Sequence, residues 1–386
     1  MQNLSIRKKL FFLFFLFVLI ELGSLILVGS IQVIFKKKLL SEIYIFNSNK
    51  DMNSRDGFSE IDMLYGWRNP LGDTFVNPIW DQLETAKEGY IHNGIPFKMP
   101  DKNKKIFILG GSTVAGFGAS GNHKTISAQL QNKLKEKGYA YSVYNYGVGG
   151  YYSFQELQYL SFELIKYKPD IVIVMDGSNN ARYTAPNRNP YNLTFAYSSY
   201  REEIQKKINK PPSLTSILKS RLKSISATTF LFSKCIDKLT KLGERKKVAK
   251  LFVANTEVIQ RSVDEHMLMW KNMMGLSIAH DFSLVLMTQP VIYYKQVLSP
   301  EEKLAFKKWP DDVHQAYRKY SEKLVSTIQN IHPINNNIIV LESSKLFKGF
   351  TQQTYTYDPI HYHNFGNKII ANYMMNNLMK NNFIEK

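Results

Sequence analysis

A serine that follows two glycines is the first residue of this chain that could carry out covalent chemistry. The stretch KKIFILGGSTVAGFGASG runs from Lys104 to Gly121, and a short apolar strand leads directly into Ser112. A glycine-rich turn after a buried strand either cradles a phosphate with backbone N–H groups or presents a serine as a nucleophile. A nucleophile also needs a general base and a third group that orients the base.

The phosphate-binding alternative meets few of its own requirements. Gly116-Phe-Gly118-Ala-Ser-Gly121 matches G-x-G-x-x-G, but it begins well after the strand ends and not in the strand-to-helix turn. No acidic residue closes a second strand about 20 residues further on, as a dinucleotide site requires. No G-K-[ST] sequence follows the glycines, as an ATP-type phosphate loop requires. The turn therefore favours a serine nucleophile.

The groups that such a serine needs stand after other apolar segments. Near the C-terminus, in YDPIHYHNFGNKIIA, Asp358 can bond one imidazole nitrogen of His361 while the other nitrogen faces Ser112. Gly150 follows a strand in NYGVGGYYSF, and Asn179 follows another in VIVMDGSNN. We expect the N–H groups of Ser112 and Gly150 and the side-chain amide of Asn179 to bind the negative charge that develops on a carbonyl oxygen.

The spacing of apolar residues predicts the elements that position these groups. Strands are expected at 106–109, 141–146, 171–175, 283–287 and 338–341. Helical periodicity predicts helices at 125–137, 153–167, 258–280, 313–331 and 367–379. Alternation of strands and helices indicates an α/β fold with a doubly wound parallel sheet. Ligands bind at the carboxyl ends of the strands in such sheets, where the serine, glycine and asparagine stand.

Taken together, these blocks resemble the SGNH (GDSL-type) hydrolase family, which is named for a Ser, a Gly, an Asn and a His in consecutive motifs. ILGGST with Ser112 resembles block I, and NYGVGG with Gly150 resembles block II. DGSNN with Asn179 resembles block III, and DPIHYHNFGN with Asp358 and His361 resembles block V. All of these blocks occur in the family's order.

The resemblance covers about residues 100–386, apart from a basic insertion described below. It implies a flavodoxin-like three-layer α/β/α sandwich with a five-stranded parallel sheet. It also implies serine-dependent cleavage of acyl esters without a metal or an organic cofactor. The family's spacing between its histidine and a following glycine fits His361 and not His363. Gly111 and Asn180 stand where the family often has Asp, which leaves the substrate class open.

The N-terminal hundred residues predict a membrane anchor and a lead-in segment. Residues 1–9 form a basic flank, and the stretch at 10–35 is long and apolar enough to span a bilayer as an uncleaved helix. Lys and Arg are nearly balanced on its two sides, so their count does not fix the orientation. We expect residues 36–100 to pack on a hydrolase domain at 101–386. The resemblance and the short basic N-terminus favour an extracytoplasmic, periplasmic domain.

Composition limits the partners. The 386-residue chain has a formal net charge of +18, which indicates either anionic surroundings or an AT-rich coding bias. Basic residues gather in a helical insertion at about 200–250, which either lies on an anionic membrane surface or packs on the domain with its basic face in water. Within it, Cys235 is expected to pack and not to react. We expect no nucleic-acid partner.

Residues and resemblance together predict a membrane-anchored, single-pass serine esterase. Its expected substrate is an acyl ester, chiefly an O-acetyl ester, of an envelope glycan or a related small molecule. Two alternatives use the same site: an O-acyltransferase that passes the acyl group to another sugar, and a lysophospholipase-like lipid esterase. A further alternative is a glycan-binding or assembly protein with a disused site.

Overall fold

The candidate site lies in one of two units into which the chain divides. The computed structural model describes residues 14–24, 26, 60–62, 64–69, 71–72, 74–75, 83–86, 88–93, 103–183, 256–331, 333, 335–356 and 358–385. One unit comprises Met1–Asp51 and Arg201–Lys250, and the other comprises Met52–Tyr200 and Leu251–Lys386. All residues expected to take part in catalysis belong to the second unit.

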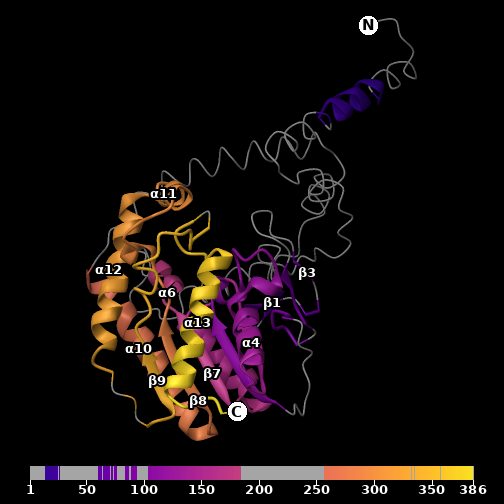
Figure 1. Cartoon of the computed structure of the whole chain (residues 1–386). Helices are drawn as coiled ribbons and strands as arrows, with labels where there is room; N and C mark the ends of the chain where they lie inside the picture. The colour runs from indigo at the N-terminus through magenta and orange to yellow at the C-terminus, as the bar shows by residue number, and fades with distance from the viewer. Residues whose placement is uncertain are drawn as a thin grey trace, which may run out of the picture. The chain divides into compact units, whose positions relative to one another are not determined.

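A five-stranded parallel sheet forms the centre of the second unit (Figure 1). Its strands lie in the order β6-β5-β7-β8-β9, and every pairing is parallel. The bounds are β5 (Lys104–Gly110), β6 (Tyr141–Gly147), β7 (Ile171–Asp176), β8 (Ser283–Thr288) and β9 (Ile338–Leu341). This confirms the five expected strands and the parallel sheet. The order is that of flavodoxin-like folds.

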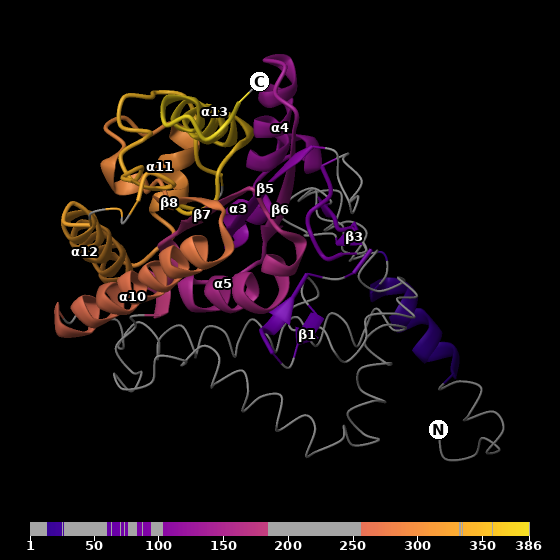
Figure 2. The ribbon, with the colours of Figure 1, turned by 90° about the horizontal axis from the view of Figure 1, so that it is seen from below.

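Helices cover both faces of this sheet, which gives the expected three layers (Figure 2). One face carries α4 (Ile126–Glu136) and α13 (Asn364–Lys380), and the other carries α5 (Ser153–Tyr159), α10 (Thr256–His280) and α12 (Asp311–Ile328). Strands β5 to β8 are almost wholly buried because both faces are covered, whereas the edge strand β9 is largely half-buried. Ile108 and Ile173, for example, share a core cluster with Ile370 of α13.

Shorter helices differ from expectation or were not expected. The stretch expected as one helix at 153–167 consists of α5, a π-helical turn (Leu160–Leu164) and a 3-10 turn (Ile165–Tyr167). Three short helices lie in the loops that follow strands: α3 (Ser112–Ala115), α6 (Ser178–Tyr183) and α11 (Pro300–Phe306). Short antiparallel pairs are formed by β1 (Glu60–Asp62) with β2 (Gly66–Arg68) and by β3 (Thr74–Phe75) with β4 (Leu83–Glu84). Further 3-10 turns lie at Asn122–Lys124 and Ile292–Tyr294.

Described residues of the expected lead-in segment contact the loop after β6. Trp67 is buried, and its Nε1–H donates to the carbonyl of Gly149 at 2.7 Å. In return, the hydroxyl of Tyr151 donates to the carbonyl of Trp67 at 2.6 Å. Asn69 donates from Nδ2 to the carbonyl of Gly147 at 2.9 Å. The indole of Trp67 therefore packs inside the fold and holds the loop after β6.

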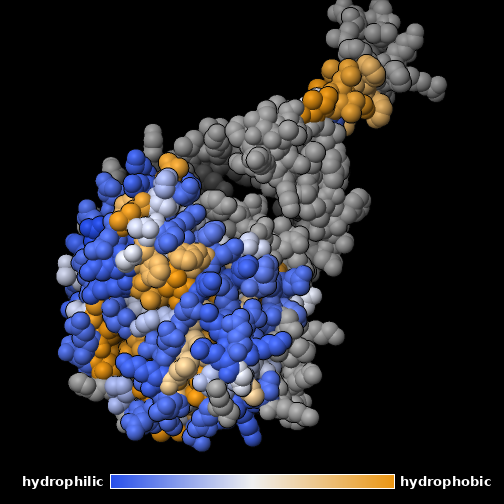
Figure 3. Space-filling view, in the orientation of Figure 1, coloured by the Kyte–Doolittle hydropathy of each residue, from blue (hydrophilic) through white to orange (hydrophobic). Residues whose placement is uncertain are grey.

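Residues 14–24 of the first unit are helical and expose large apolar side chains, such as Phe14 and Phe17. They appear as the hydrophobic segment of Figure 3, whereas hydrophilic residues dominate the face of the second unit in view. Within the described ranges, no helix has both the length and the apolar character needed to cross a membrane. Of the expected span at 10–35, only residues 14–24 and 26 are described. The expected insertion at 200–250, with Cys235, lies outside the described residues.

Candidate active site

Ser112 begins α3 directly beyond the carboxyl end of β5. Its Oγ lies 2.8 Å from Nε2 of His361, although 249 positions separate the two residues in sequence. The strand order reverses between β5 and β7, and open α/β sheets bind their ligands at such a switch point. Ser112 is half-buried, so part of the residue is accessible to solvent.

Asp358 orients the imidazole of His361 from the side opposite Ser112. The Nδ1–H of His361 donates to Oδ2 of Asp358 at 2.7 Å. The other carboxylate oxygen, Oδ1, accepts the backbone N–H groups of Ile360 at 2.8 Å and His361 at 2.9 Å. Burial alone would raise the pKa of Asp358, but the charge of His361 and these hydrogen bonds outweigh it and lower the pKa below its ordinary value. The carboxylate is therefore ionised and fixes the imidazole tautomer that can accept a proton at Nε2.

A small hairpin presents this Asp–His pair. Tyr355 and Tyr362 form an antiparallel bridge, and the N–H of Thr356 donates to the carbonyl of His361 at 2.9 Å. His363 donates its own N–H to the opposite arm and then precedes α13. The structure thus brings His361 to Ser112, whereas His363 serves the backbone of the hairpin.

The amide of Asn179 lies against the residue before Ser112. Asn179 is the second residue of α6, and its Nδ2 donates to the carbonyl of Tyr151 at 2.7 Å. A Cβ atom at Gly111 would lie 2.4 Å from this Nδ2 and 3.1 Å from the Tyr151 oxygen, so only glycine allows the approach. Gly150 precedes Tyr151 with φ of +82°, a left-handed conformation that favours glycine. An amide carries two N–H groups, and Tyr151 occupies one of them, so the second is available to a substrate oxygen.

Alanine at either Asn179 or Gly111 is expected to weaken the same interaction. We expect Asn179→Ala to lower kcat about 100- to 1,000-fold, the usual cost of one oxyanion donor. Gly111→Ala should give a loss of similar size, because its new methyl group would displace the Asn179 amide. The φ of Gly111 is −79°, which any residue adopts, so backbone strain does not contribute. Steady-state hydrolysis of an aryl acetate measures both losses.

The double variant and a matched glycine substitution test this reasoning. Because both changes remove one donor, the double variant should lose no more activity than Asn179→Ala alone. Gly275→Ala in α10 is the control, since a Cβ atom there meets nothing within 4 Å. Additive losses, or full activity of Gly111→Ala, would contradict the assigned role of Asn179.

A buried polar cluster holds the end of β7, three residues before Asn179. The Nε2–H of His266 donates to Oδ1 of Asp176 at 2.7 Å, and Nδ1 of His266 lies 2.8 Å from the hydroxyl of Tyr320. His266 and Asp176 are almost wholly buried. Burial, and then the charge of Asp176, raise the pKa of nearby Glu156 well above its ordinary value. These hydrogen bonds fix the end of the strand from which the Asn179 turn departs.

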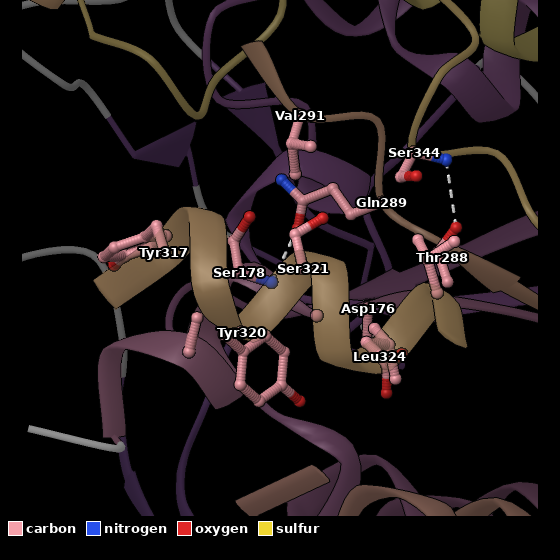
Figure 4. Close-up of a pocket in the computed structure, with 13 residues that line it drawn as sticks. Asp176, Ser178, Thr288, Gln289, Val291, Tyr317, Tyr320, Ser321, Leu324 and Ser344 are labelled. Carbon is pink, nitrogen blue, oxygen red and sulfur yellow. Dashed lines mark hydrogen bonds between the residues drawn. The ribbon is translucent and has the colours of Figure 1, made fainter. Parts of the chain in front are cut away.

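A pocket borders the same turn on the α12 side (Figure 4). Its walls include Ser178 and Gln289 beyond the strand ends and the apolar side chains of Leu324 and Val325. The N–H of Ser178 donates to Oε1 of Gln289 at 3.4 Å, which links the loops after β7 and β8. Ser112 and His361 are absent from the lining of this pocket, so the pocket is not the reaction centre.

Several contacts that support the site could not be inferred from the sequence. Asn180 donates from Nδ2 to Oγ of Ser153 at 2.7 Å and so ties the Asn179 turn to α5. Trp67 donates a hydrogen bond to the carbonyl of Gly149, although the two residues are 82 positions apart in sequence. No local pattern marks such partners, because each bond joins residues from distant parts of the chain. Nor do the described residues contain any cluster of three or more His, Cys, Asp or Glu side chains that could hold a metal ion.

The chain also matches a known family. The model of the GDSL-like lipase/acylhydrolase family matches residues 108–247, a range that includes Ser112, Gly150 and Asn179. His361 and Asp358 lie beyond the match, and the fold brings them to Ser112. Residues 108–247 of the chain therefore carry a GDSL-like lipase/acylhydrolase domain. Members of this family are esterases and acylhydrolases, so this hydrolase is an enzyme that acts on carboxylic ester bonds.

Solved structures that match this hydrolase do so at low sequence identity. A lipase from a goat rumen metagenome is 11% identical, with 70% of this chain and 96% of that chain covered and a TM-score of 0.41. A lipase/acylhydrolase from Enterococcus faecalis is 13% identical over 73% and 97%, with a TM-score of 0.35. An acetylxylan esterase from Geobacillus stearothermophilus is 13% identical over 73% and 97%, with a TM-score of 0.39. No curated protein matches the chain in sequence.

Proposed function

We propose that this hydrolase is a membrane-anchored serine esterase that removes acyl groups, chiefly O-acetyl groups, from an envelope glycan or a related ester. The observation that carries the proposal is the chain of two short hydrogen bonds from Ser112 through His361 to Asp358, at 2.8 and 2.7 Å. A nucleophile bonded to a base, which is itself bonded to an orienting carboxylate, is the arrangement that acyl transfer requires.

The proposed reaction runs through an acyl-enzyme. Ser112 Oγ attacks the ester carbonyl while His361 Nε2 takes its proton, and Asp358 stabilises the imidazolium that forms. The backbone N–H groups of Ser112 and Gly150 and the Asn179 amide bind the developing oxyanion. His361 then gives the proton to the departing alcohol. Water attacks the acyl-enzyme next, again with His361 as the base, and releases the carboxylic acid and the free serine.

An aromatic side chain lies beside the proposed catalytic base. The ring centre of Phe117 lies 6.1 Å from that of His361, and a Cβ atom at Gly149 would lie 3.4 Å from the Phe117 ring. An aromatic side chain therefore bounds the space between His361 and the loop after β6. The net charge of +18 is also suited to an anionic, polymer-bearing surface.

Activity-based labelling followed by a substrate panel tests this proposal. A fluorophosphonate should modify Ser112, as identified by peptide mass spectrometry, and acetate should be released from acetylated sugars and aryl acetates. Absence of labelling would contradict a working nucleophile. Faster hydrolysis of phospholipids than of acetylated sugars would contradict the substrate class, and acetyl transfer to an added glycan would make the enzyme a transferase.

We propose further that residues 10–35 anchor the enzyme and that its catalytic domain lies outside the cytoplasmic membrane, in the periplasm. The apolar sequence of this stretch and the exposed apolar side chains of residues 14–24 support an anchor. Reporter enzymes fused after residue 386 test the topology. A reporter that is active only in the cytoplasm would contradict the proposed location.

A further inference from the structure

A buried ion pair lies outside the groups described so far. Nζ of Lys295 donates to both carboxylate oxygens of Glu302 in α11, at 2.8 and 2.6 Å. Both side chains are completely buried. Glu302 also forms a capping box with Ser299 at the start of α11, in which the N–H of Ser299 donates to Glu302 at 2.8 Å and Ser299 Oγ accepts the N–H of Glu302.

The remaining hydrogen bonds of the pair converge on one segment, 352–355. The hydroxyl of Thr354 accepts from Nζ of Lys295 at 3.2 Å and donates to Oε1 of Glu302 at 3.0 Å. Oε1 of Glu302 accepts the backbone N–H groups of Thr354 at 2.8 Å and Tyr355 at 3.0 Å. Nζ of Lys295 donates to the carbonyl of Gln352 at 2.6 Å. The carboxylate of Glu302 thus binds two N–H groups of this segment, and the ammonium of Lys295 binds one of its carbonyls. Such charge-assisted bonds are roughly twice as strong as neutral ones.

This segment is the first arm of the hairpin that presents His361. The carbonyl of Thr354 accepts the N–H of His363 at 2.8 Å, and the bridge between Tyr355 and Tyr362 follows. The hairpin backbone links the segment that Glu302 holds to His361, because the N–H of Thr356 donates to the carbonyl of His361. Figure 1 shows α11 at the same end of the sheet as the start of α13, which the hairpin precedes.

We propose that Lys295 and Glu302 are positioning residues for the reaction. They hold the hairpin so that His361 Nε2 stays within hydrogen-bond reach of Ser112 while protons move. A well-packed apolar pair would fill the same space without the cost of burying two charges, so packing alone does not account for them. The inference rests on the proposed Ser112 chemistry. Because neither residue belongs to the site that binds the ester, their loss should change kcat and leave KM unchanged.

Two variants separate the charges from the hydrogen-bond acceptor. Glu302→Gln keeps an oxygen that can accept the N–H groups of Thr354 and Tyr355, but it leaves Lys295 as an unpaired buried charge. We expect kcat on an aryl acetate to fall about 100-fold, the effect of a shift of roughly 1 Å in a catalytic group. KM should stay within about twofold. Adding Lys295→Met to Glu302→Gln removes the unpaired charge and should recover about tenfold of the lost kcat.

Local and global effects are distinguished by hydrogen–deuterium exchange of the folded variants. Peptides from 352–363 should exchange faster in Glu302→Gln, while peptides from β5 and β7 keep wild-type protection. Glu301→Gln is the matched control, because Glu301 is exposed one position earlier on the same helix. Wild-type kcat in folded Glu302→Gln, a rise in KM alone, or faster exchange throughout the sheet would each overturn the positioning role. Failure of wild-type enzyme to be labelled at Ser112 would instead overturn the proposed function.

Discussion

Replacing Ser112 by alanine should lower kcat by about 10,000- to 1,000,000-fold, the range seen when a serine nucleophile is removed from a triad. The change removes one oxygen from a half-buried side chain, so the fold should persist. Hydrolysis of an aryl acetate in the steady state measures the loss, and fluorophosphonate labelling of the same sample should disappear. The oxyanion donors remain in this variant, so a small residual rate above that of water is expected.

A distant serine supplies the control for this experiment. Ser326→Ala lies on the exposed part of α12, where the hydroxyl bonds only within its own helix at Lys323. Its activity and its labelling should equal those of the wild type. If Ser112→Ala released acetate at the wild-type rate, another group would be the nucleophile and the triad assignment would be wrong.

The sheet could be predicted because its strands are buried on both faces. Such strands read as continuous apolar runs, and β7, with the sequence IVIVMD, is an example. Glycine, asparagine and aspartate after these runs mark where each strand ends. The order of the motifs then placed Ser112, Gly150 and Asn179 at one edge, because parallel strands share the direction of their carboxyl ends.

Short elements held by tertiary bonds could not be predicted. α11 has seven residues, too few for a helical period to be recognised, and its first turn depends on the capping box between Ser299 and Glu302. The π-helical turn at Leu160–Leu164 follows an ordinary helical pattern, and nothing in its local sequence indicates the wider turn. In both cases the spacing of apolar residues does not indicate the element, because a capping interaction or an unusual backbone turn determines it.

Precise contacts in the site were beyond prediction for the same reason. The spacing of Asp358 and His361 predicts a local pair, but it does not give the 2.8 Å approach of His361 to Ser112. That approach depends on the hairpin and on the Lys295–Glu302 pair, whose members are seven positions apart in sequence. A buried lysine cannot be recognised from one sequence, because most lysines are exposed.

The Asp358→Asn variant is expected to retain its fold and to lose about 10,000-fold in kcat, because it imposes the wrong imidazole tautomer. Oδ1 of Asp358 accepts two backbone N–H groups, from Ile360 and His361. In the variant only the amide oxygen can accept them, so the amide N–H₂ group must face Nδ1 of His361. The imidazole then accepts at Nδ1 and carries its proton at Nε2, where it cannot take the proton of Ser112.

The ¹⁵N NMR spectrum of the same variant separates a tautomer effect from a loss of structure. Imidazole tautomers can be read from ¹⁵N NMR shifts of His361, and the proton should move from Nδ1 to Nε2 in Asp358→Asn. Asp311→Asn, an exposed aspartate at the start of α12, is the control and should keep full activity. Asp358 has a lowered pKa, so its bonds add stability above its unfolded-state value of about 3.8 and lose it as pH falls through the folded-state pKa. Wild-type enzyme should therefore keep this stabilisation throughout neutral pH. For the variant, a kcat of Asp358→Asn within tenfold of the wild-type value would show that the carboxylate does not select the tautomer.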